Sequence, residues 1–193
     1  MRVLHWIGLA AFLWNMALFV LAIRRGFARP EGMPPLMRVL SAVGLVSLAA
    51  DALLITFATS TQAVWQLSAG LALLALSQWL FRSALSAMQE APLSLAFSED
   101  APSFLLQRGP YRWVRHPFYT AYTLSWLAVV VITTHALAAV VLLLMGTLYV
   151  CAAVQEERKF LGSALASDYR AYRQRTGMFL PSINSHPSYE RRY

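Results

Sequence analysis

The sequence has a single cysteine, Cys151, and none of its nine glycines forms a G-x-G-x-x-G run. One cysteine cannot form a disulfide within the chain or a cysteine-based metal cluster, so no metal site is predicted. Cys151 itself lies in an apolar run, where a small packing residue is expected. The absent glycine run argues against the phosphate-binding turn of a Rossmann domain.

Charge is also scarce. Charged residues make up 13% of the chain and hydrophobic residues 58%, whereas an ordinary soluble domain is about 45 to 50% apolar. This composition predicts a membrane protein. The net charge of +7 could indicate nucleic acid, but the cations flank apolar runs and no nucleic-acid-binding motif is present. Anionic lipid headgroups or an anionic ligand are the expected partners.

Five apolar segments are found, at about 3–23, 36–58, 63–81, 118–133 and 136–154. A helix needs about 20 residues to cross the hydrocarbon of a bilayer, and the fourth segment is short of that. The first segment lacks the basic start and small-residue cleavage site of a signal peptide, so a retained span is expected. The sequence therefore predicts an all-α integral membrane protein, with five transmembrane helices in one domain over 1–193.

The arginines predict the orientation of these helices. They flank the first and third connections and recur in the tail, whereas the connections near Ser60 and His135 carry no formal charge. By the positive-inside rule, the N-terminus is outside and the cytoplasmic segments are 83–117 and 155–193. The flanking arginines are Arg24, Arg25, Arg29, Arg38, Arg82, Arg108, Arg112 and Arg115.

The two cytoplasmic segments differ in character. The connection contains Pro92 and Pro102 and is too irregular for one long helix. The tail has helix-forming composition before Pro181, and its last dozen residues are expected to fray. One apolar stripe is predicted along the tail helix, formed by Phe160, Leu161, Leu165, Tyr169 and Tyr172.

The stretch GPYRWVRHPFYTAY, residues 109–122, joins cations and aromatic rings at the entry to the fourth segment. Pro117 suits the first turn of a helix, and the connection at 134–135 fits only a tight helical hairpin. Ideal helices place His116 about 27 Å and Glu156 about 33 Å from that connection. The R-H-P and E-E pairs are therefore predicted to be neighbours at the cytoplasmic end of the hairpin.

Two interpretations of this cluster remain open. The arginines and tyrosines could be interfacial anchors, with Glu156 and Glu157 pairing loosely with Arg112 or Arg115. Alternatively, cationic and anionic side chains beside aromatic rings suit a ligand that carries an ammonium, a carboxylate and a sulfonium cation, such as S-adenosylmethionine.

The same residues resemble the isoprenylcysteine carboxyl methyltransferases and the related phospholipid N-methyltransferases. Those families share a G-P-Y-x-x-x-R-H-P-x-Y block, then an E-E pair, a Y-x-x-Y helix and a proline. The matching residues are Gly109, Pro110, Tyr111, Arg115, His116, Pro117, Tyr119, Glu156, Glu157, Tyr169, Tyr172 and Pro181. The resemblance covers about the C-terminal half of the chain.

This resemblance implies an integral membrane methyltransferase that binds S-adenosylmethionine between the end of the hairpin and the C-terminal segments. The implied cofactor-binding residues are Leu106, Gln107, Gly109, Tyr111, Arg115, His116, Pro117, Tyr119 and Glu156. On the acceptor side, Arg112 or Arg175 could hold a carboxylate bidentately. An amine or thiol acceptor must lose a proton, for which Glu157, His116 and Tyr119 are candidates.

The expected acceptor is lipophilic: the α-carboxylate of a prenylated cysteine first, or a phospholipid amine such as phosphatidylethanolamine. There are two alternatives: a non-enzymatic module that binds anionic lipid, and a dinucleotide-dependent reductase of the steroid-reductase type. Within the spans, Asp51 is expected to bond to a polar residue of the third span. Asn15 is expected to join helices, and Gln78 either to do so or to line a pocket.

Overall fold

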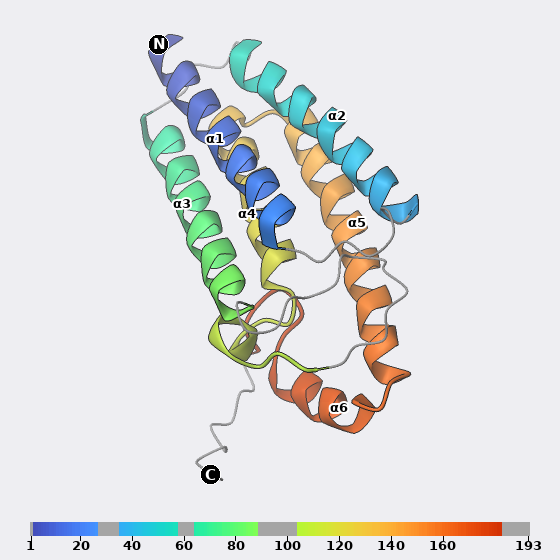
Figure 1. The fold of residues 1–193 in the computed structure, drawn as a ribbon. Helices are drawn as coiled ribbons and strands as arrows, with labels where there is room; N and C mark the ends of the chain where they lie inside the picture. Colours follow the sequence, from blue (N-terminus) through green and yellow to red (C-terminus); the bar gives the residue numbers. More distant parts are fainter. Residues whose placement is uncertain (1, 27–34, 58–63, 89–103, 183–193) are drawn as a thin grey trace.

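The structure is a computed structural model that describes residues 2–26, 35–57, 64–88 and 104–182 (Figure 1). Within those ranges the only strand-like feature is one isolated bridge, so the all-helical prediction is confirmed there. The expectations for 89–103 and for the last dozen residues lie outside the described residues. The elements are α1 (Arg2–Gly26), α2 (Pro35–Phe57), α3 (Val64–Ala87), η1 (Gly109–Arg112), α4 (Pro117–Thr133), α5 (Ala136–Leu161) and α6 (Ala166–Arg175).

The five long helices lie side by side, and the short α6 lies at the end of the bundle away from the N-terminus (Figure 1). α3 packs along α4, α1 contacts α2 and α3, and α5 contacts α4 and α2. Phe12, Trp126 and Met145 are buried between them, whereas Val46 and Leu143 are exposed on the outside. A bundle that is apolar both inside and outside is typical of a protein surrounded by lipid.

Four of the helices are long and apolar enough to cross a membrane: α1, α2, α3 and α5. α4 is apolar but shorter, at 17 residues. These lengths agree with an integral membrane protein, and the predicted fifth span rests on α4.

The chain reverses within two residues between α4 and α5. Thr134 adopts a left-handed conformation with φ 48°, and its N–H donates to Val130 O. His135 then caps α5, because its Nδ1 accepts the N–H of Leu137 at 3.1 Å. The turn therefore brings α5 back along α4.

Two helices extend beyond the predicted spans. α3 continues to Ala87 rather than ending near 81, because Ala84 and Ala87 pack against Tyr111. α5 continues to Leu161 rather than ending near 154, through a polar stretch of good helix formers. Hydropathy marks the part of a helix that suits lipid, and not the residue at which the helix ends.

The prediction of one helix along the tail is wrong. α5 ends at Leu161 and α6 begins at Ala166. Between them the Ser163 hydroxyl donates to Phe160 O at 2.8 Å and accepts the N–H of Leu165 at 3.1 Å, which closes a turn. The Phe160 and Tyr169 rings nevertheless stack across this break, with centroids 4.8 Å apart.

Polar residues join three of the helices, as expected for Asn15. Its Nδ2 donates to Ser125 Oγ at 2.7 Å, and Gln78 Nε2 donates to Asn15 Oδ1 at 2.6 Å. The expectation for Asp51 is wrong: neither of its carboxylate oxygens has a hydrogen-bond partner among the described residues, although the side chain is fully buried. Cys151 is also exposed rather than packed inside.

Candidate functional site

The turn η1 brings the glycine-proline-tyrosine block against the end of α3. Gly109 has a φ of 57°, which glycine adopts without strain. A Cβ at this position would lie 3.2 Å from the Ala87 Cβ, so the two backbones approach closely. Tyr111 is buried in this contact, with Leu106 packed beside it.

The start of α4 fixes His116. The helix begins at Pro117, as predicted, and His116 is the residue that precedes its first turn. Both the backbone N–H and the hydroxyl of Thr120 donate to His116 O, at 3.0 and 3.1 Å. The backbone of His116 is therefore held at the start of α4.

A C-terminal strap, residues 176–180, lies along the start of α4. Arg115 N donates to Gly177 O at 2.8 Å, and His116 N donates to Met178 O at 3.1 Å. A Cβ on Gly177 would lie 1.8 Å from Leu180 O, so the turn of the strap requires glycine. The strap thus binds the R-H-P segment through backbone hydrogen bonds.

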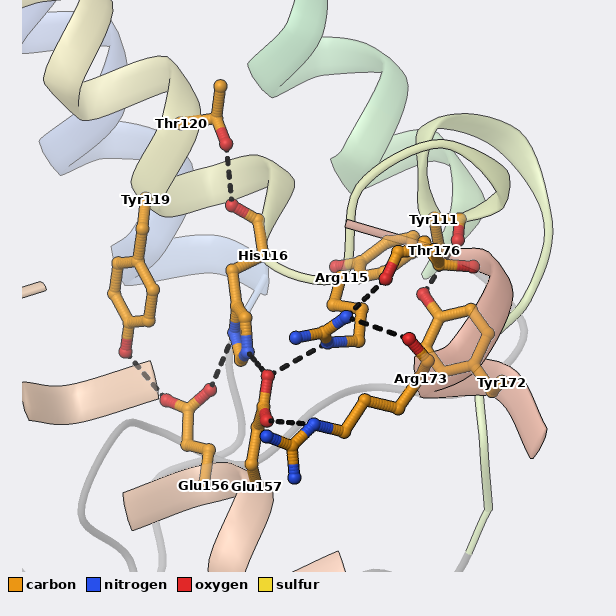
Figure 2. Close-up of polar contacts among 10 residues, drawn as sticks. All are labelled: Tyr111, Arg115, His116, Tyr119, Thr120, Glu156, Glu157, Tyr172, Arg173 and Thr176. Atoms are coloured by element: carbon orange, nitrogen blue, oxygen red, sulfur yellow. Dashed lines mark hydrogen bonds and ion pairs between the residues drawn. The ribbon is translucent and has the colours of Figure 1, made fainter. Parts of the chain in front are cut away.

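The centre of the site is His116 between two carboxylates (Figure 2). Its Nδ1 lies 3.4 Å from Glu156 Oε2, and its Nε2 lies 3.3 Å from Glu157 Oε1. Arg115 Nε also donates to Glu157 Oε1, at 2.8 Å. Arg173 Nε lies 3.6 Å from Glu157 Oε2, so three cationic side chains surround this carboxylate.

Both nitrogens of His116 face carboxylate oxygens, an arrangement that suits the doubly protonated imidazolium. Burial by itself lowers the pKa of His116. The hydrogen bonds and charges of Glu156 and Glu157 outweigh that effect, so the pKa is raised above its ordinary value. The two carboxylates therefore favour the protonated form of His116.

Aromatic rings continue from His116 into the bundle. The Tyr119 ring stacks on His116 at 5.7 Å and on Tyr149 at 5.4 Å between centroids. The Tyr119 hydroxyl donates to Glu156 Oε1 at 2.6 Å. Glu156 is the more accessible carboxylate, with a side chain that is 30% exposed against 5% for Glu157.

Two tyrosines connect η1 to α6. The Tyr172 hydroxyl donates to Tyr111 O at 2.6 Å (Figure 2). The hydroxyl of Tyr111 is buried and has no hydrogen-bond partner among the described residues. Burial also raises the pKa of Tyr111 well above its ordinary value, so this group is an uncharged donor. A buried hydroxyl without a partner is what a bound ligand could satisfy.

The structure divides the residues proposed from the sequence into two groups. Arg115, His116, Tyr119, Glu156 and Glu157 are joined by the contacts above, next to Pro117. The others surround the segment before α4. Leu106 and Tyr111 pack on α3, Arg112 is exposed, and Arg175 Nη2 donates to Gln107 Oε1 at 2.9 Å on the surface.

A phospholipid methyltransferase family model matches residues 65–168, which is more than half of the chain. The chain belongs to the phospholipid methyltransferase family. The match includes α3, η1, α4 and α5, and it therefore contains both carboxylates and the R-H-P segment.

Two curated relatives share this methyltransferase region. Methanethiol S-methyltransferase of Mycobacterium tuberculosis is 36% identical over 77 residues, which are 39% of this chain and 30% of the relative. The protein of the same name from Pseudomonas deceptionensis is 34% identical over 77 residues, 40% of this chain and 28% of the relative. The matched part thus spans less than a third of each relative.

Several members of the site were missed by the sequence reasoning, and some lie beyond the region that the methyltransferase family model matches. Arg173 and the strap follow residue 168. Arg173 comes one helical turn after Tyr169, which belongs to the predicted apolar stripe. This spacing could have predicted that Arg173 lies on the same face of the helix as Tyr169. The backbone contacts of Gly177 and Met178 had no signal in the sequence.

Proposed function

We propose that the protein is an S-adenosylmethionine-dependent methyltransferase that acts on a lipophilic acceptor at the membrane surface. The observation that carries this proposal is His116 held between Glu156 and Glu157 at one end of an apolar bundle, in a member of a methyltransferase family. A site in this position can bind a water-soluble cofactor from the aqueous side and a membrane-bound acceptor from the lipid side.

The residues present fit S-adenosylmethionine. The exposed part of Glu156 can accept hydrogen bonds from an ammonium or a ribose, and the Tyr111 hydroxyl has no partner within the described part of the chain. Tyr119 would act through Glu156, because its ring stacks on His116 and Tyr149 and its hydroxyl donates to Glu156 Oε1. Leu106, Gln107 and Gly109 would complete the cofactor site, together with Arg115, His116 and Pro117.

S-adenosylmethionine supplies an electrophilic methyl group on a sulfonium. The contribution of this chain is orientation and the exclusion of water, which account for much of the acceleration of a direct displacement. Glu157 is 4% exposed and faces Arg115, His116 and Arg173. We therefore assign Glu157 to holding these cations in place rather than to accepting a proton.

The acceptor proposed first is a prenylated cysteine, whose carboxylate needs no general base. Arg112 and Arg175 are exposed around the segment before α4 and are available to bind that carboxylate. A long apolar tail would raise the local concentration of the acceptor, since each buried methylene adds about 0.8 kcal/mol of partitioning. A phospholipid amine is the second compound of this class.

A thiol is the other candidate acceptor, because both curated relatives are named for methanethiol. A thiol is uncharged and needs no arginine, but it must lose its proton. Arg112 and Arg175 therefore separate the two classes of acceptor. Replacing both with glutamine should slow transfer to a prenylcysteine and leave transfer to a thiol nearly unchanged.

We further propose that α4 is a fifth span, with the N-terminus outside and the site in the cytoplasm. The arginine-rich connections and the position of the cluster at one end of the bundle support this orientation. Single cysteines at Ser60 and Ser98, in a Cys151→Ala background, should then be labelled from opposite sides of intact cells. Labelling from the same side would contradict the five spans.

The decisive experiment is ligand binding by the full chain in detergent. S-adenosylmethionine or S-adenosylhomocysteine should raise the melting temperature, since a ligand at about 100 times its Kd stabilises by about 2.7 kcal/mol. Transfer of a tritiated methyl group should then be compared across prenylcysteines of increasing tail length, phosphatidylethanolamine and methanethiol. Binding of a reduced nicotinamide dinucleotide in place of both sulfur compounds would overturn the proposal in favour of a reductase.

A further inference from the structure

Two hydrogen bonds between side chains join α4 to α5. In the outer bond, the Tyr119 hydroxyl donates to Glu156 Oε1 at 2.6 Å. In the inner bond, Trp126 Nε1 donates to the Tyr149 hydroxyl at 3.0 Å. On each helix the two participants are separated by about two turns, so each pair lies on one face of its helix.

The two bonds differ in their surroundings. Trp126 and Tyr149 are 3% and 6% exposed and belong to the main apolar core. Glu156, by contrast, has a side chain that is 30% exposed. Inside the apolar bundle no water can take the place of a lost hydrogen-bond partner. The inner bond therefore strongly constrains its two side chains.

Stacked rings connect the inner bond to the outer one. The Tyr149 ring lies 5.4 Å from the Tyr119 ring, with 13° between their planes. The Tyr119 ring in turn stacks on the His116 ring, with their centroids 5.7 Å apart and 22° between their planes. A rotation of Tyr149 would therefore displace Tyr119, and with it the hydroxyl that holds Glu156.

We propose that Trp126 and Tyr149 are positioning residues for Glu156. The inner bond sets the register of α4 on α5 and the orientation of the Tyr119 ring. In this way it fixes the carboxylate that receives the cofactor. This inference rests on the proposed function, because it presumes that a ligand contacts Glu156.

The test uses Trp126→Phe and Tyr149→Phe in the full chain, with S-adenosylhomocysteine as the probe. Each variant keeps an aromatic ring and removes one end of the inner bond. We expect each to weaken binding of S-adenosylhomocysteine by about five-fold in calorimetry. The double variant should bind about as weakly as either single variant, because both changes remove the same bond. It also leaves neither polar atom unpaired, so it remains measurable if a single variant is too unstable.

Ser125→Ala is the matched control. The Ser125 hydroxyl is buried and bonds to Asn15 of α1 at 2.7 Å and to Ser77 of α3 at 2.8 Å, and among the described residues it bonds to no side chain of α5. This variant should lower the melting temperature and leave the Kd within about two-fold. If Trp126→Phe and Tyr149→Phe also lowered the melting temperature at an unchanged Kd, their role would be structural and the inference wrong. A wild-type chain that does not bind the probe would instead contradict the proposed function itself.

Discussion

Arg115 and Glu157 are 42 positions apart in the sequence, and their side chains form an ion pair of 2.8 Å at the meeting point of α4 and α5. Both side chains are nearly buried, at 8% and 5% exposure. The pair also connects α6 and the strap to the bundle, because Arg115 Nη1 donates to Thr176 O and to Arg173 O. Removing it should therefore affect both stability and the shape of the site.

We predict that Glu157→Gln lowers the free energy of unfolding by about 3 to 5 kcal/mol, because Arg115 and His116 would keep their charges without a carboxylate between them. Thermal unfolding in detergent measures the loss. Arg173→Gln is the control, since Arg173 is 51% exposed and should contribute no more than about 1 kcal/mol. Equal losses in both variants would show that Arg115 is not the main partner of Glu157.

Gly177→Ala should detach the strap, because the new Cβ would lie 1.8 Å from Leu180 O. The N–H groups of Arg115 and His116 would then lose their acceptors, and hydrogen exchange at both should become faster. Gly146→Ala is the matched control on α5, where a Cβ meets nothing within 4 Å. It should be neutral or stabilise the helix by up to about 1 kcal/mol. Unchanged exchange in Gly177→Ala would mean that the turn of the strap tolerates a side chain.

Tyr111→Phe and Tyr172→Phe should have opposite effects on the free protein. Tyr111→Phe removes a buried hydroxyl that has no partner among the described residues, so the free protein should be at least as stable as wild type. If that hydroxyl binds the cofactor, the affinity for S-adenosylhomocysteine should fall about ten-fold, since one hydrogen bond is lost. Tyr172→Phe removes a bond to Tyr111 O and should cost about 0.5 to 1.5 kcal/mol of stability. Unaltered affinity in Tyr111→Phe would remove Tyr111 from the cofactor site.

Stability should fall with rising pH through His116. Its pKa is raised in the folded protein, where burial opposes ionisation but Glu156 and Glu157 favour it more strongly. The stabilisation is therefore complete below the pKa of the unfolded chain, about 6.5, and is lost as the pH rises through the folded value. Melting curves of wild type and His116→Gln should differ most near pH 6 and converge at higher pH. A constant difference across this range would show that His116 is not ionised in the site.

The sequence alone determined the parts of this protein that depend on local properties. Apolar runs located the helices that suit a membrane, and Pro117 marked the first residue of α4 because proline needs no hydrogen bond there. The fixed rise of a helix was enough to place His116 near Glu156, since the turn between α4 and α5 is only two residues long.

Only the tertiary structure decided which partner each of these groups contacts. Glu156 and Glu157 are adjacent in the sequence, yet one accepts a bond from Tyr119 and the other from Arg115. Neighbouring residues on a helix point about 100° apart, so the rotation of α5 against α4 makes this choice. The pairing of the strap with Arg115 depends likewise on contacts between segments about 60 positions apart. Such contacts leave no periodic pattern in a single sequence, because their energy belongs to the packed fold and not to either segment alone.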